Sequence, residues 1–294
     1  MKNNKFKQVW LFLISIFLIV VGSQIIIDYQ QETFKEADFE PNIENGEYVF
    51  NASGCSGCHM SLGGQDRREL GGGKSFRTTF GVFFATNISM STRYGIGSWS
   101  LNDFNNAVRN GLSPKGDHYF PSFPFTSYSR MKDKDLVDLW YYWQTLPAVE
   151  FSNTTHDLDF PFSIRQAMWF WKKAFFRNNW VFKETDPRGI YLVESLAHCA
   201  ECHTPRNKLG GLITSSWMRG GVNPEGGGLI PDIVDTTKDW SLKDIEEYLL
   251  SGFTPDFDTA GGSMVEVIES TKLLTAEDRN AIAKYIKGLS KQID

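Results

Sequence analysis

Cysteine is scarce in this sequence, and the few cysteines are confined to two places. The 294-residue chain has four of them, in two clusters of identical spacing: Cys55 with Cys58, and Cys199 with Cys202. None is left over for the disulfide framework that stabilises many small secreted domains. The clusters therefore predict cofactor attachment and not structural cross-links.

An excess of positive charge is also absent. The chain carries 30 Lys and Arg residues against 35 Asp and Glu residues, a net charge of -5. Proteins that bind nucleic acid normally show a basic stripe or an overall basic balance. We therefore expect no nucleic-acid partner.

Two catalytic patterns are missing as well. The glycine-rich loops at residues 71–73 and 226–228 lack the strand and the Gly-Lys-Ser/Thr context of a phosphate-binding loop. No acid and base residues are paired in a pattern typical of a substrate pocket. We expect the glycines to let the backbone pass close to a large flat cofactor.

One long hydrophobic run is present, at the N-terminus. After a basic start, residues 9–27 are interrupted only by Ser15, Gly22, Ser23 and Gln24. A helix of this length reaches roughly the hydrocarbon thickness of a bilayer. The alternative, a cleaved signal peptide, would show a small-x-small cleavage site, which does not follow. We expect a transmembrane helix in an anchor and tether at residues 1–36, in contact with lipid of a bacterial inner membrane, with the rest of the chain periplasmic.

The remainder of the chain contains a pattern that occurs twice. One copy runs from Gly46 to His59 and the other from Gly189 to His203, and each is followed later by a segment with helical apolar spacing. This duplication predicts two domains, at residues 37–150 and 186–294. We expect the opening and closing helices of each domain to cross where their tyrosines meet, Tyr48 with Tyr142 and Tyr191 with Tyr285.

An aromatic and basic segment lies between the copies. Residues 164–177 are too few and too charged to span a membrane. We predict an amphipathic helix in a linker at residues 151–185. Docking on the protein's own domains or on a partner is favoured over contact with a membrane interface.

Each cysteine cluster is followed at once by a histidine, which makes it a Cys-x-x-Cys-His motif. In such a motif the cysteines form thioether links to a haem and the histidine binds the iron. A thioredoxin-like dithiol or half of a zinc site would not explain both histidines. The sequence predicts two covalently bound haem c groups, held by Cys55, Cys58 and His59 and by Cys199, Cys202 and His203.

An iron that only transfers electrons needs a sixth ligand, and methionine is the usual one. In the second domain Met264 follows Gly261 and Gly262 and precedes the closing helix, with Met218 as the alternative. In the first domain Met131 lies just before the closing helix. Its rivals are His118, Met90 and Met60.

The chain resembles the cytochrome c subunits of bacterial membrane-bound dehydrogenases that oxidise alcohols, aldehydes, sugars and sugar acids. The resemblance extends from about residue 44 to the C-terminus and is carried by residues 80–88, 95–100, 118–131, 188–193 and 198–207. It implies two all-α c-type domains with histidine and methionine ligation, beside a separate catalytic subunit. Familiar members often carry three haems, and members with methionine in the Pro-x-x-Pro segment differ from this chain, which has Phe123 there.

Together these features predict an all-α fold, an N-terminal transmembrane helix followed by two c-type cytochrome domains. The expected function is an electron relay without substrate chemistry of its own. A dehydrogenase catalytic subunit would be the donor and a soluble cytochrome or a terminal oxidase the acceptor. The alternatives are a dihaem subunit of a terminal oxidase and a dihaem enzyme, such as a peroxidase or a thiosulfate dehydrogenase, which needs an open or labile iron ligand.

Overall fold

The computed structural model describes residues 7, 8, 10–12, 15, 22, 34, 39–182, 186–223 and 228–290. The chain divides into two compact units, residues 1–35 and residues 36–294. Most of the hydrophobic run at residues 9–27 lies outside the described residues. Everything that follows concerns the unit at residues 36–294.

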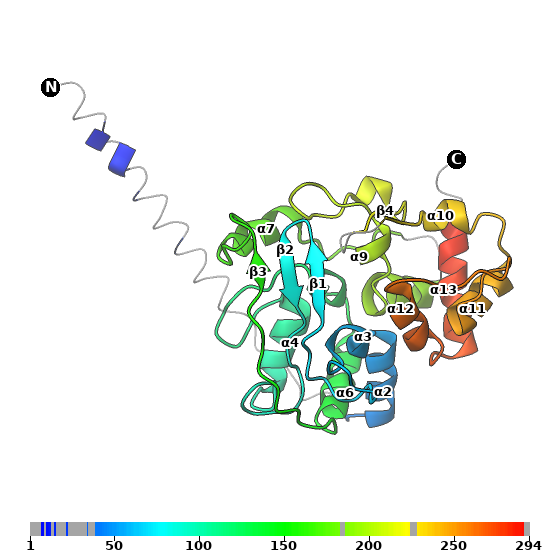
Figure 1. The fold of residues 1–294 in the computed structure, drawn as a ribbon, viewed down its shortest axis with the longest axis horizontal. Helices are drawn as coiled ribbons and strands as arrows, with labels where there is room; N and C mark the ends of the chain where they lie inside the picture. The colour runs from blue at the N-terminus through cyan, green and yellow to red at the C-terminus, as the bar shows by residue number, and fades with distance from the viewer. Residues whose placement is uncertain are drawn as a thin grey trace. The chain divides into compact units, whose positions relative to one another are not determined.

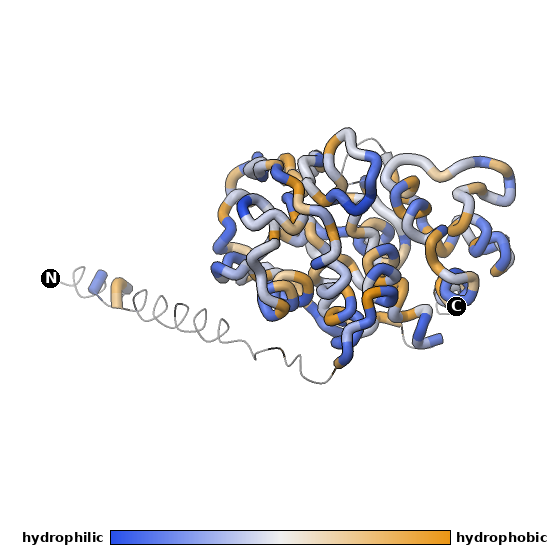
Figure 2. Tube along the Cα trace, turned by 90° about the horizontal axis from the view of Figure 1, so that it is seen from below, coloured by the Kyte–Doolittle hydropathy of each residue, from blue (hydrophilic) through white to orange (hydrophobic). Residues whose placement is uncertain are grey.

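The described residues contain no helix of the length and apolar character that a membrane crossing requires. The longest helix given for them, α13 (Ala276–Leu289), has 14 residues, whereas a span needs about 20. Hydrophobic and hydrophilic stretches alternate at short intervals along the described part of residues 36–294 (Figure 2). The expected N-terminal transmembrane helix is corrected by this finding.

The first half of the unit is built around one cysteine motif (Figure 1). Its elements are α2 (Ile43–Ala52), α3 (Cys55–His59), β1 (Ser75–Thr78), β2 (Gly81–Phe84), α4 (Leu101–Asn110), α5 (Phe125–Tyr128) and α6 (Asp133–Trp143).

The connecting segment and the second half follow. Their elements are β3 (Asp157–Leu158), α7 (Ala167–Phe175), α8 (Pro187–Tyr191), a π-helical turn (Leu192–Leu196), α9 (Ala200–His203), a 3-10 turn (Thr214–Ser216), β4 (Gly221–Val222), β5 (Leu229–Ile230), α10 (Ile233–Thr236), α11 (Leu242–Ser251), α12 (Met264–Thr271) and α13.

The strands make the all-α expectation wrong. β1, β2 and β3 form a three-stranded antiparallel sheet, and β4 pairs with β5. Phe83 on β2 packs with Phe120 and Met168, so burial of an aromatic face holds the first sheet. β3 approaches so closely that a Cβ at Gly81 would lie 2.4 Å from the Asp157 carbonyl oxygen. The second strand pair contains only residues 221–222 and 229–230.

Corresponding helices of the two halves begin and end in the same way. Ser100 at the start of α4 and Ser241 at the start of α11 each form a capping box with the aspartate three residues on. α4 ends at Gly111 with φ 58° and α11 at Gly252 with φ 79°. Glycine tolerates this left-handed conformation, so both helices stop at the same point of the repeat.

The opening and closing helices of each half cross at a glycine. A Cβ at Gly46 on α2 would lie 2.1 Å from the carbonyl oxygen of Asp138 on α6. A Cβ at Gly189 on α8 would lie 2.4 Å from the carbonyl oxygen of Ala281 on α13. The helix backbones therefore touch at both crossings.

The predicted linker helix exists as α7 and docks on the protein itself. Lys172 donates hydrogen bonds to the carbonyl oxygens of Asn110 and Gly111 at the end of α4, over 2.6 and 2.8 Å. The indole of Trp171 donates to the carbonyl oxygen of Leu209 in the second half, over 2.8 Å. The segment thus contacts both halves of the protein through its own side chains.

Candidate functional site

The first cysteine motif forms helix α3, which starts after Gly54 in the left-handed conformation. Cys58 is exposed and Cys55 is partly covered. Nδ1 of His59 lies 2.8 Å from the carbonyl oxygen of Thr86. Because a carbonyl oxygen only accepts, Nδ1 carries the hydrogen and Nε2 keeps the lone pair that binds a metal.

The second motif repeats this arrangement. Its helix α9 ends with His203, whose Nδ1 lies 3.0 Å from the carbonyl oxygen of Pro231. The carbonyl oxygen of each histidine also accepts a glycine N–H, from Gly72 in the first half over 2.9 Å and from Gly220 in the second over 2.7 Å. Both histidines are thus held by the same two contacts, one at the imidazole Nδ1 and one at the backbone carbonyl oxygen.

Burial acts on the thiols and the imidazoles in opposite directions. It raises the pKa of Cys55 and of Cys199 to about 12. Desolvation lowers the pKa of His59 and of His203, against the opposing effect of their backbone hydrogen bonds. The histidines are therefore neutral at pH 7, the form in which imidazole is a metal ligand.

The predicted methionines occupy different environments. Met264 is the first residue of α12 and is half-buried. Met131 and Met218 are buried, with exposed fractions of 4% and 0%. Their role as ligands stays a prediction.

The helix α5 of the first half contacts the second motif. Thr126 and Ser127 donate hydrogen bonds to the carboxylate of Glu201, between the motif cysteines, over 2.7 and 3.0 Å. Tyr128 donates to the carbonyl oxygen of Ser53, over 2.8 Å, and its ring centroid lies 5.4 Å from that of His198. Tyr128 and His198 therefore lie between the two motifs.

The helix α12 of the second half contacts the first motif in turn. A Cβ at Gly57, between the motif cysteines, would lie 3.4 Å from Cβ of Glu266. Arg67 donates to Ser270 over 3.1 Å and pairs with Glu266 over 3.5 Å. Each half thus covers the cysteine motif of the other.

Comparison with known proteins identifies the family. No family model matches the chain. It is 46% identical over 248 residues to a diheme cytochrome c-type protein of Cereibacter sphaeroides, over 82% of this chain and 84% of that protein. The chain belongs to the diheme c-type cytochromes. This family supports haem c as the cofactor, and its diheme name agrees with the two motifs.

Other relatives of this diheme cytochrome family are dehydrogenase subunits. The chain is 34% identical over 284 residues to the fructose dehydrogenase cytochrome subunit of Gluconobacter japonicus, over 92% of this chain and 57% of that subunit. It is 33% identical over 265 residues to the gluconate 2-dehydrogenase cytochrome c subunit of Pantoea cypripedii, over 84% of this chain and 59% of that subunit. The chain thus spans little more than half the length of these two. The expected resemblance is confirmed, and these relatives are cytochrome subunits, as expected for an electron-transfer protein.

The residues present fit the haem of a diheme cytochrome. Each motif offers two thiols and one imidazole oriented by its Nδ1 hydrogen bond, and a haem supplies the remaining equatorial ligands itself. In addition, Nε of Arg67 is buried, and none of the described residues accepts a hydrogen bond from it. A haem propionate is an acceptor of the required charge.

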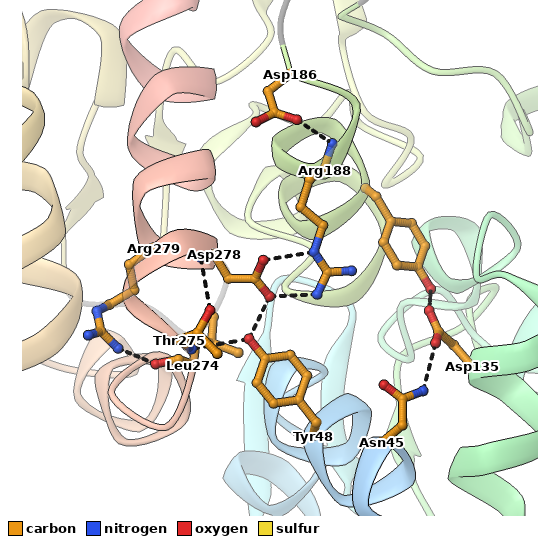
Figure 3. A network of polar contacts seen from close by, with 10 residues as sticks. Asn45, Tyr48, Asp135, Asp186, Arg188, Leu274, Thr275, Asp278 and Arg279 are labelled. Atoms are coloured by element: carbon orange, nitrogen blue, oxygen red, sulfur yellow. Dashed lines mark hydrogen bonds and ion pairs between the residues drawn. The ribbon is translucent and has the colours of Figure 1, made fainter. Parts of the chain in front are cut away.

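Sequence reasoning missed the tyrosine contacts of this diheme cytochrome. Tyr48 donates a hydrogen bond to Asp278 of the other half, which also accepts from Arg188 (Figure 3). Tyr191 donates in the same way to Asp135. The expected meeting of Tyr48 with Tyr142 and of Tyr191 with Tyr285 stays a prediction, and the hydroxyls of Tyr48 and Tyr191 have their partners in the opposite half.

Proposed function

We propose that this chain is a periplasmic electron-transfer subunit that relays electrons from a dehydrogenase catalytic subunit to the respiratory chain. The observation that carries the proposal is the pair of motifs, both with a histidine fixed through Nδ1, inside one compact unit. The relatives named for fructose and gluconate dehydrogenases support a dehydrogenase as the donor. A soluble cytochrome or a terminal oxidase is the acceptor.

In this proposal the chain holds two haem c groups. Bound haem supplies a one-electron carrier. The cysteines of the motifs form the thioether links, and Nε2 of His59 and His203 binds the irons. Met264 provides the sixth ligand in the second half.

The protein's own contribution is to fix the two sites relative to each other. Glu201 is bound by the first half and by Arg206, and its side chain is only 9% exposed. The Tyr128 hydroxyl donates a hydrogen bond to the carbonyl oxygen of Ser53, and the Tyr128 ring packs against the ring of His198. These contacts hold the two motifs at one separation, so little rearrangement accompanies electron transfer.

The first test is the covalent haem content. Mass spectrometry of the full chain, expressed with haem-attachment machinery, should show two haem additions. The double variant Cys199→Ser, Cys202→Ser should show one, because only the first motif then keeps its thiols. A wild-type mass without added haem would rule the proposal out.

The second test is the source of electrons. Alcohols, aldehydes, sugars and sugar acids should leave the oxidised, purified chain unreduced, because its described residues offer no paired acid and base for substrate oxidation. Addition of a periplasmic or membrane fraction that contains a dehydrogenase should reduce both haems, followed at the α-band. Reduction by one of these substrates without the fraction would favour a dihaem enzyme instead.

The periplasmic location is tested separately. A chain on the periplasmic side should be released with the periplasmic fraction, or remain with sealed spheroplasts and be digested by added protease. Complete protection inside intact spheroplasts would contradict this part of the proposal.

A further inference from the structure

The two halves repeat their backbone hydrogen bonds, and this repetition identifies corresponding residues. After α4, Tyr119 donates its N–H to the carbonyl oxygen of Gly111 over 2.8 Å; after α11, Ala260 donates to Gly252 over 2.8 Å. Inside these loops an isolated β-bridge joins Leu112 to His118 in one half and Phe253 to Thr259 in the other. Both loops therefore have the same length and the same register.

The register continues without insertion to Met264. Its N–H donates to the carbonyl oxygen of Gly261 over 3.2 Å. In the first half, the N–H of Phe123 donates to the carbonyl oxygen of Phe120 over 3.1 Å. Phe123 thus holds the place in the first half that Met264 holds in the second.

Met131 corresponds to a different residue. Its N–H donates to the carbonyl oxygen of Tyr128 over 2.8 Å, as the N–H of Leu274 donates to Thr271 over 3.1 Å. Both side chains are 4% exposed. Because a leucine fills the corresponding place in the other half, Met131 is placed as a core residue.

Met218 gives an independent check of this reasoning. Its carbonyl oxygen accepts from Ile233 over 3.1 Å, as that of Leu70 accepts from Ile88 over 3.0 Å, and both Met218 and Leu70 are 0% exposed. Two buried methionines thus have leucine counterparts. Met264, half-buried at the start of its helix, does not.

Phe123 lies near the first motif. Its ring centroid is 5.8 Å from that of Tyr128, whose hydroxyl reaches the carbonyl oxygen of Ser53 just before Cys55. A second aromatic contact, 6.0 Å between centroids, joins it to Tyr119. The phenyl ring of Phe123 has no lone pair with which to bind a metal.

We propose that no methionine closes the sixth position of the first haem, and that this position takes a small external iron ligand such as carbon monoxide. The inference rests on the proposed function, because it requires haem at His59. It differs from that function in giving the first haem a ligand-binding site, while the second haem stays closed by Met264.

Carbon monoxide is the probe for the test. Titration of the full, dithionite-reduced chain should reach one carbon monoxide per two haems in the Soret difference spectrum. The oxidised chain should show the near-infrared sulfur-to-iron band of one methionine-ligated haem. Phe123→Met should reduce carbon monoxide uptake at least tenfold and about double that band.

Met131→Leu is the matched control, because leucine is its counterpart in the second half. It should change neither the uptake nor the band. A wild-type chain that binds no carbon monoxide would overturn the inference. In that case, halving of the near-infrared band by Met131→Leu would assign Met131 as the sixth ligand of the first haem. Carbon monoxide uptake gained by His118→Ala would assign His118 instead.

The remaining outcome is equally decisive. Uptake at both haems would show that Met264 is no ligand and would remove the comparison between the halves on which the inference depends. Failure of the proposed function is distinguishable, because the mass spectrum would then lack haem before any ligand is added.

Discussion

Replacing Gly46 by alanine should lower the free energy of unfolding by about 3 kcal/mol, the upper end of the usual cost of overpacking. The new Cβ would lie 2.1 Å from the Asp138 carbonyl oxygen and 2.6 Å from Cβ of Tyr142. The first of these atoms belongs to helix backbone, so α2 and α6 must separate. The better helix propensity of alanine offsets at most about 1 kcal/mol of this cost. Urea denaturation of the haem-loaded chain measures the difference.

A matched variant shows whether the effect comes from the helix crossing. Gly261→Ala should change the stability by less than about 0.5 kcal/mol, because no atom lies within 4 Å of the added Cβ. Gly189→Ala should behave like Gly46→Ala, since its Cβ meets the Ala281 carbonyl oxygen at 2.4 Å. Equal stabilities of Gly46→Ala and Gly261→Ala would mean that the helices do not cross at this distance.

Replacing Asp278 by alanine should lower the free energy of unfolding by about 2 kcal/mol. The change removes the acceptor of Tyr48, which lies in the opposite half, and the acceptor of two hydrogen bonds from Arg188 of the same half (Figure 3). The Arg188 side chain is 38% exposed, so water compensates part of its loss. Asp256→Ala, at an exposed turn, serves as the control and should have little effect.

The same carboxylate should make stability depend on pH. Burial alone would raise the pKa of Asp278, but hydrogen bonds from Arg188 and Tyr48 outweigh it and hold this pKa below its ordinary value. The stabilising contribution is therefore complete above the unfolded-state pKa of about 4 and is lost as the pH falls toward the lower folded-state pKa. Between pH 5 and pH 3, wild type should lose more stability than Asp278→Asn. Parallel losses would contradict this role for Asp278.

The parts of the fold that sequence predicted are the local ones. The cysteine motifs are read from spacing within five residues, and the closing helices from apolar periodicity together with Thr275 as the N-cap of α13. Both are set by neighbours along the chain. The structure adds the histidine anchors at Thr86 and Pro231, each formed across a loop.

The parts that sequence did not predict depend on distant partners. Tyr48 and Asp278 are 230 residues apart in the chain, and no local pattern links them. The pairing of β3 with β2 requires a close approach at Gly81 that the glycine alone does not reveal. The position of Met131 just before the closing helix suggested it as a ligand, whereas the repeated hydrogen bonds make Phe123 the counterpart of Met264.

The mutual covering of the motifs also has a consequence for the maturation of this protein. Glu201 and Gly57 stand between the paired cysteines, and in the folded chain α5 and α12 of the opposite halves lie over them. An attachment enzyme that binds the peptide between two cysteines therefore meets it only on a nascent or open chain. We therefore expect haem attachment to precede closure of the two halves.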